Sequence, residues 1–133
     1  MWTTGKELSL GQVAAVFVGG GIGATLRYIL GGAVYRFMGG DFPYGTLLIN
    51  VIGCFFIGFL MSLFDERFVV YPTMRAFLTI GILGGFTTFS TFSYETMALL
   101  REGNYLRGTA NVVYTILNGL GATWLGTVIG KLL

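Results

Sequence analysis

Five hydroxyl-bearing side chains occur within seven consecutive positions, from Thr87 to Ser93. Two glycines, Gly84 and Gly85, precede them in the run GGFTTFSTFS. Because serine and threonine hydroxyls bond nearby backbone groups and glycine weakens a helix, this segment favours an interrupted helix. The freed carbonyls of Gly84 and Thr87 could then hold a cation, while freed amides and hydroxyls could serve an anion.

Two phenylalanines alternate with these hydroxyls. Phe89 and Phe92 are three positions apart, so they share one face of a helix. The edge of a phenyl ring carries partial positive charge, which allows both rings to face a small anion. Ordinary packing is the alternative for any two phenylalanines in an apolar helix, and the dense hydroxyl context shifts the interpretation toward an anion path.

Further polar side chains interrupt apolar runs. Asn50 either hydrogen-bonds across helices or lines a pore, and Arg27 either extends to the membrane surface or keeps a vestibule positive. Glu95 is expected to anchor the end of the helix that follows the hydroxyl segment. In the last apolar run, polar residues recur at three- and four-residue steps, which predicts one stripe suited to a permeation track. The stripe comprises Asn111, Tyr114, Thr115 and Asn118.

The composition predicts that much of the chain is surrounded by lipid and not by water. Of 133 residues, 54% are apolar and only 11% are charged, against about 25% in a typical soluble domain. The absence of histidine and the single Cys54 exclude an intrachain disulfide and a Cys/His zinc site. No nucleophile–base pair is visible, so an enzyme is not expected, and a net charge of +2 gives no reason to expect nucleic acid.

Four apolar runs predict an all-α membrane protein with a single domain. The expected spans are about 12–35, 44–64, 74–100 and 106–131. At about 1.5 Å per residue each run crosses a hydrocarbon core of about 30 Å. The first run is too long for the core of a secretory signal and is expected to remain as a helix. The middle of the third run falls at Phe86 or Thr87, so the predicted break lies near the bilayer midplane, where irregular backbone must face protein or a watery cavity.

Lysine and arginine are divided evenly between the two sides of the predicted bundle. One side carries Lys6, Arg67, Arg75 and Lys131, and the other carries Arg27, Arg36, Arg101 and Arg107. Because this bias normally orients a membrane protein, the balance predicts insertion in both directions and pairing as an antiparallel homodimer. A weak bias through Lys6 or Arg75 is the alternative.

Taken with these motifs, the chain resembles the Fluc/CrcB family of fluoride channels over nearly its whole length. The resemblance is carried by residues 84–93, by the glycine-rich residues 19–27, and by residues 45–50. It implies an antiparallel dual-topology homodimer with two pores in the inner (plasma) membrane of a cell. It also implies passive, electrogenic efflux of fluoride, which gives fluoride resistance.

The resemblance also implies roles for individual residues. Phe89 and Phe92 would flank the fluoride path, and the backbone carbonyls of Gly84 and Thr87 would hold a structural Na⁺ at the dimer interface. Arg27 would lie in the vestibule. Polar contacts along the path would come from Asn50, Ser90, Thr91 and Ser93. From the polar stripe of the last run, Thr115 is a further candidate for this path. One departure is Asn111, which stands where some members carry a tyrosine.

Two other function classes remain open at this point. A small multidrug-type proton-coupled exporter also has four short helices, but it needs a deep carboxylate, and the first run has none. A non-transporting membrane scaffold would explain the GxxxG-spaced glycines at 19/23 and 81/85, but not the hydroxyl-rich break.

Overall fold

All regular structure in the computed structural model, which describes residues 8–133, is helical. The long helices are α1 (Leu10–Met38), α2 (Tyr44–Glu66) and α6 (Tyr105–Leu132). The third span is assembled from α3 (Pro72–Arg75), the π-helix η1 (Ala76–Leu83), α4 (Gly84–Phe86) and α5 (Phe89–Arg101). Within the described residues four helices are long and apolar enough to cross a membrane, which confirms the predicted class. Lys6, counted above, lies outside the described residues.

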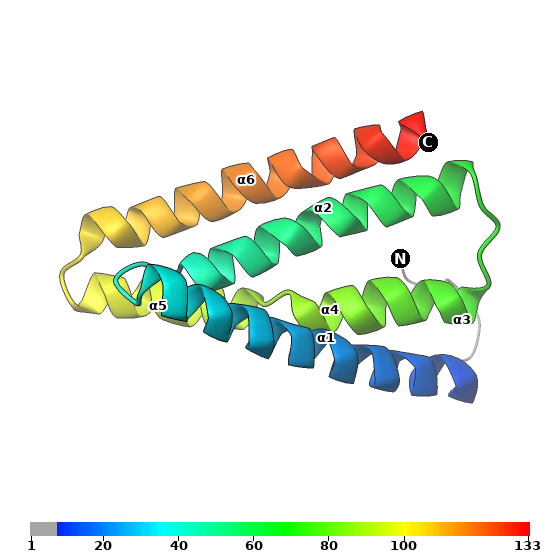
Figure 1. Ribbon diagram of the computed structural model, residues 1–133, viewed down its shortest axis with the longest axis horizontal. Coiled ribbons are helices and arrows are strands. Elements are labelled where there is room, and N and C mark those ends of the chain that lie inside the picture. Colours follow the sequence, from blue (N-terminus) through cyan, green and yellow to red (C-terminus); the bar gives the residue numbers. More distant parts are fainter. Residues whose placement is uncertain (1–7) are drawn as a thin grey trace.

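Successive spans run in opposite directions, so the start of α1 and the end of α6 lie at the same end of the bundle (Figure 1). Short connections make this possible. Gly39 ends α1 with a φ of 77°, a left-handed conformation that glycine adopts without strain, and its N–H donates to the Tyr35 carbonyl at 2.9 Å. Pro43 caps the start of α2, and Pro72 begins α3, where a missing N–H costs nothing.

The third span changes its neighbour along its length. Its first part, η1 with α4, packs against α1, whereas α5 packs against α6 (Figure 1). Helix α2 contacts both parts and runs alongside α6. The site of the neighbour change is therefore the break between α4 and α5.

Glycines allow the backbones of these helices to approach closely. A Cβ built on Gly23 would overlap the Ile82 carbonyl oxygen and stand 2.8 Å from the Phe86 nitrogen. On the other side of the bundle, a Cβ on Gly126 would overlap the Phe55 carbonyl oxygen. In lipid, where apolar burial drives little association, this backbone proximity is the main source of helix packing.

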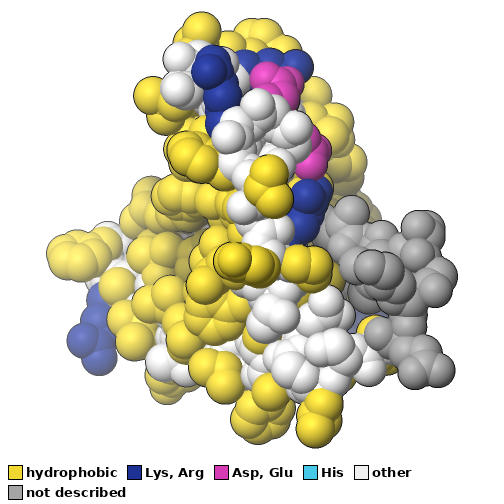
Figure 2. Space-filling view, turned by 90° about the vertical axis from the view of Figure 1, so that its right-hand side faces the viewer, with side chains coloured by type: hydrophobic (Ala, Val, Ile, Leu, Met, Phe, Trp, Pro, Cys, Tyr) yellow, Lys and Arg dark blue, Asp and Glu magenta, His cyan; other side chains and the backbone are white. Residues whose placement is uncertain are grey.

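The outer surface is apolar and its ends are polar, as a bilayer requires. Figure 2 looks onto the end where α6 finishes, and shows most of the visible lysine, arginine and acidic side chains in its upper half, with apolar and uncharged atoms over much of the rest. Ion pairs at this end join Arg75 to Asp65 at 2.9 Å and Lys131 to Glu66 at 3.4 Å.

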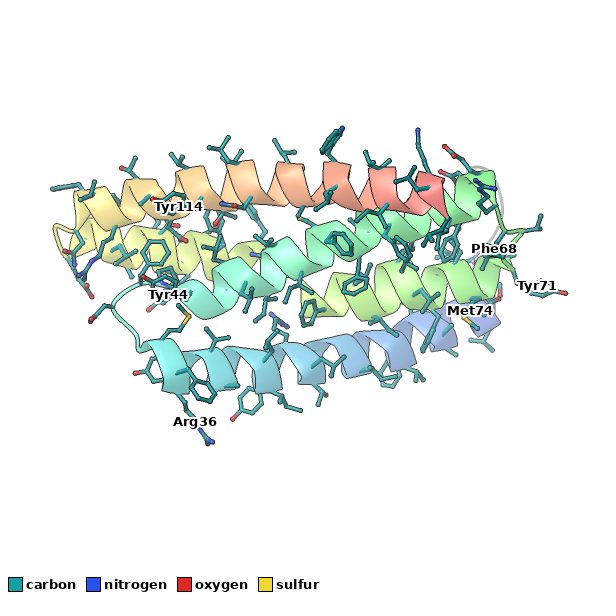
Figure 3. The ribbon with its side chains drawn as sticks, turned by 45° about the horizontal axis from the view of Figure 1, so that its top comes forward. Arg36, Tyr44, Phe68, Tyr71, Met74 and Tyr114 are labelled. Atoms are coloured by element: carbon teal, nitrogen blue, oxygen red, sulfur yellow. The ribbon has the colours of Figure 1, made fainter. Side chains whose placement is uncertain are left out.

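Aromatic side chains mark both ends of the bundle. Tyr44 and Tyr114 lie toward one end, and Phe68 and Tyr71 lie at the other (Figure 3). The Phe42 ring lies between the first two, with centroids 4.9 Å from Tyr44 and 6.5 Å from Tyr114. Such belts are typical of the two membrane–water interfaces.

Candidate functional site

The break in the third span consists of two extended threonines. Thr87 has φ −77° and ψ 157°, and Thr88 has φ −151° and ψ 113°. Helix α4 ends directly before them and α5 begins directly after them, so the predicted interruption is confirmed at the middle of the span.

Asn50 of α2 satisfies both backbone groups of Thr88. Its Nδ2 donates to the Thr88 carbonyl at 3.0 Å, and its Oδ1 accepts the Thr88 N–H at 2.8 Å. Since a buried unpaired backbone group is costly, this one amide side chain stabilises the extended conformation of Thr88.

The Thr88 hydroxyl starts the next helix. It accepts the Thr91 N–H at 3.2 Å, which makes Thr88 the N-cap of α5, and it donates to the Thr91 hydroxyl at 3.0 Å. The Ser90 hydroxyl lies 3.3 Å away and extends this cluster toward the surface.

The same bonds release two carbonyls. In an unbroken helix the Thr88 N–H would donate to Gly84 and the Thr91 N–H would donate to Thr87. Here those donors go to Asn50 Oδ1 and to Thr88 Oγ1 instead. The carbonyl oxygens of Gly84 and Thr87 thus lack their helical donors, which leaves them available as ligands for a hard cation.

Two clefts meet at the break. The first cleft, of about 1010 Å³, opens between α1, α2 and α5, and the second, of about 890 Å³, opens between α2, η1, α5 and α6. Thr88 lines both of them. A solute that crossed from one cleft to the other would therefore pass this threonine.

The first cleft is lined by charged and polar groups from three helices. Arg27 of α1 and Thr91 of α5 line it, and so does Glu95. The Thr46 hydroxyl donates to Glu95 Oε1 at 2.9 Å, while Glu95 Oε2 is buried without a partner among the described residues. Glu95 thus bonds across to α2, whereas the sequence suggested an anchor for its own helix.

The second cleft contains the aromatic pair. Phe89 and Phe92 have ring centroids 5.5 Å apart and an interplanar angle of 50°. Their surroundings differ, because Phe92 is 8% exposed and Phe89 is 78% exposed. Thr115 of α6 lines the same cleft, and its buried hydroxyl has no hydrogen-bond partner within residues 8–133. Asn50 and Ser93 complete the polar lining named from the sequence.

The structure separates the four residues expected to form a stripe on α6. Only Thr115 lines the second cleft. Asn111 is buried behind it and donates to Thr96, Tyr114 packs edge-on against Phe42, and the exposed Asn118 donates to the carbonyl of Tyr114. Within one protomer these four residues therefore do not line a single cleft.

Comparison with known proteins assigns the chain to a family. The family profile described as CrcB-like protein, Camphor Resistance (CrcB), matches residues 14–127. The chain belongs to the CrcB-like family.

Curated relatives of this CrcB-like chain carry one name, Fluoride-specific ion channel FluC. The protein of Geotalea uraniireducens is 46% identical over 121 residues, covering 91% of this chain and 98% of the relative. That of Aquifex aeolicus is 45% identical over 122 residues, covering 92% and 98%. Four spans and this family make the chain a multi-pass membrane protein, and in bacteria the membrane is the plasma membrane.

Sequence reasoning missed two members of the site in this CrcB-like chain. In the sequence Thr88 stands out only as one of five hydroxyls, although a threonine directly before a helix is a recognisable N-cap signal. Thr96, which lines the second cleft, gives no such signal because its role depends on Asn111 of another helix.

Proposed function

We infer that this chain is a fluoride-selective channel that lets fluoride leave the cell passively and so protects against it. The inference is supported by the name of relatives that are about 45% identical over nine-tenths of the chain, Fluoride-specific ion channel FluC. Such a protein is an ion channel and not an enzyme. The observation that supports the mechanism is the break, around which hydroxyls, an amide and two phenyl rings lie at mid-span.

The anion route runs between the two clefts past Thr88. Arg27 in the first cleft attracts the anion, and hydroxyls of the break replace its water. In the second cleft the Thr115 hydroxyl, which has no partner among residues 8–133, donates to the anion, and the partial positive charge of the Phe89 and Phe92 ring edges stabilises it. Remaining polar contacts come from Asn50, Ser90, Thr91 and Ser93.

Passive flow fits the physics of a weak acid. In acidic surroundings fluoride is protonated to neutral HF, which enters the cell and ionises there. The negative interior of the cell then drives the anion out. The driving force is about 2.3 kcal/mol per charge for each 100 mV, so no coupled ion is required.

Two copies in opposite orientations form the working channel. The even division of lysine and arginine removes the usual preference for one orientation. Phe89 and Gly84 are exposed on one protomer, although both flank the break. A second copy against this surface would shield irregular backbone from lipid, where unsatisfied groups are costly.

A sodium ion fits the carbonyls at the break. Unwound backbone carbonyls coordinate Na⁺ in transporters with broken helices, and those of Gly84 and Thr87 lack their helical donors. These two residues would hold the ion at the dimer interface, where its charge stabilises the junction of the protomers.

Fluoride efflux from proteoliposomes tests the function. Liposomes loaded with potassium fluoride are opened to potassium with an ionophore, and an electrode records the external fluoride. Wild-type protein should release fluoride only when the potassium path is open, and Phe89→Ile and Phe92→Ile should each lower the rate. The matched control is Phe17→Ile on the outer face of α1, where Phe17 is 81% exposed.

Other outcomes would decide against the proposal. Efflux that depends on a proton gradient instead of the potassium path would favour an exporter, and no efflux would favour a scaffold. Equal rates for wild-type protein and both phenylalanine variants would refute the assigned path. A C-terminal reporter that gives signal from one compartment only would refute dual topology.

A further inference from the structure

Asn111 is the most deeply buried polar side chain of α6, with 1% of its surface exposed. An amide without hydrogen bonds is costly at such a place, so its partner is informative. Its Nδ2 donates to the Thr96 hydroxyl of α5 at 2.9 Å. The residue lies outside the lining of both clefts, so it does not itself contact a permeating ion.

The Thr96 hydroxyl links Asn111 to the backbone of Phe92, one member of the aromatic pair. Its oxygen donates its single hydrogen to the Phe92 carbonyl at 2.8 Å, so it can only accept from Asn111. The chain Asn111–Thr96–Phe92 therefore has one fixed direction, and it ties the backbone of Phe92 to α6.

This tie matters because α5 begins at the break. A helix that is not continuous with the one before it depends on tertiary contacts to fix its first turns. Asn50 of α2 holds Thr88 on one side of the aromatic pair, and Asn111 of α6 holds Thr96 on the other. Two asparagines from different helices thus bracket the segment that presents both rings to the second cleft.

We propose that Asn111 is a positioning residue for Phe92, acting through the Thr96 hydroxyl, and that this bond determines how fast and how selectively the anion passes the ring. The proposal rests on the fluoride-channel function inferred above. It also explains how an asparagine serves at this position of the fourth span, because its amide acts from behind the wall of the cleft.

The test measures fluoride efflux and the ratio of fluoride to chloride permeability in proteoliposomes. Thr96→Val removes the hydroxyl and keeps the shape, and Asn111→Leu removes the amide. Each should lower the fluoride rate per folded protein by roughly tenfold and reduce the permeability ratio, since a buried partner is left unpaired and the ring shifts. Thr96→Ser, which retains the hydroxyl, should restore both values.

The double variant and a matched control sharpen the result. Because both changes break the same chain of bonds, the double variant should be no slower than the more affected single variant. Thr109→Val makes the same substitution at an exposed position of α6 and should leave both values unchanged.

The remaining outcomes distinguish failure of the positioning role from failure of the channel function. Wild-type selectivity and rate in folded Thr96→Val, with Phe92→Ile impaired, would overturn the positioning role and leave the channel function standing. Wild-type protein without fluoride flux would overturn both. If Asn111→Leu does not yield folded protein, Thr96→Val decides, because it breaks the same bond with a smaller change.

Discussion

The most direct test of the break is to remove the Asn50 side chain, which stabilises the extended backbone of Thr88. Asn50→Leu keeps a similar volume but deletes both bonds to Thr88, at 3.0 and 2.8 Å. Thr88 is buried, so each lost bond leaves a polar backbone group without water. At about 1–3 kcal/mol for each unsatisfied group, the variant should lose about 2–6 kcal/mol of stability.

The chain has one way to recover part of this energy. The Thr88 N–H could donate to the Gly84 carbonyl if the two extended threonines rewound into a helix. That change would occupy the carbonyl proposed for sodium and close the junction of the two clefts. We therefore expect Asn50→Leu both to unfold at a lower temperature in detergent and to lose fluoride efflux.

Thermal unfolding and proteoliposome efflux together measure this prediction. Asn118→Leu is the matched control for stability, because that exposed amide bonds only within its own helix, and its change should stay below about 0.5 kcal/mol. An Asn50→Leu protein with wild-type melting temperature and wild-type efflux would show that the amide does not maintain the break.

Two further predictions concern packing and the cation. Gly23→Ala should destabilise the protein by about 1–3 kcal/mol, because the new Cβ meets the backbone of Ile82 and Phe86. Gly21→Ala, where the new Cβ has open space, should be neutral or slightly stabilising. Thermal unfolding measures both variants, and equal melting temperatures would contradict the close packing at Gly23. Replacing sodium by a large organic cation on both sides should lower the melting temperature of the dimer, and restoring sodium should reverse the loss; no change on either step would argue against a sodium site.

The spans could be predicted because lipid imposes a simple rule on the sequence. Charged residues are rare over about 20 consecutive positions, so the nearly uncharged runs reveal the helices. The break was also predictable, since a glycine pair followed by five hydroxyls weakens a helix at one place. The π-helix between Ala76 and Leu83 was not, because its wider winding leaves no pattern in an evenly apolar run.

The site was less predictable, because polar side chains were assigned by position and not by partner. The sequence offers packing and pore lining as alternatives for Asn50. In the structure its side chain lines the second cleft and also hydrogen-bonds the backbone of Thr88. Helical spacing alone groups Asn111 with Thr115, but Asn111 donates to a neighbouring helix, whereas the Thr115 hydroxyl has no partner in the described part of the chain. Only tertiary contacts distinguish these cases.

The change of neighbour along the third span has an evolutionary consequence. Substitutions between Ala76 and Phe86 must be accommodated by α1, whereas those between Phe89 and Arg101 must be accommodated by α6. Apart from their shared contacts with α2, the two halves of one membrane crossing are thus under different constraints. Correlated variation among homologues should accordingly split into two blocks that meet at Thr87 and Thr88.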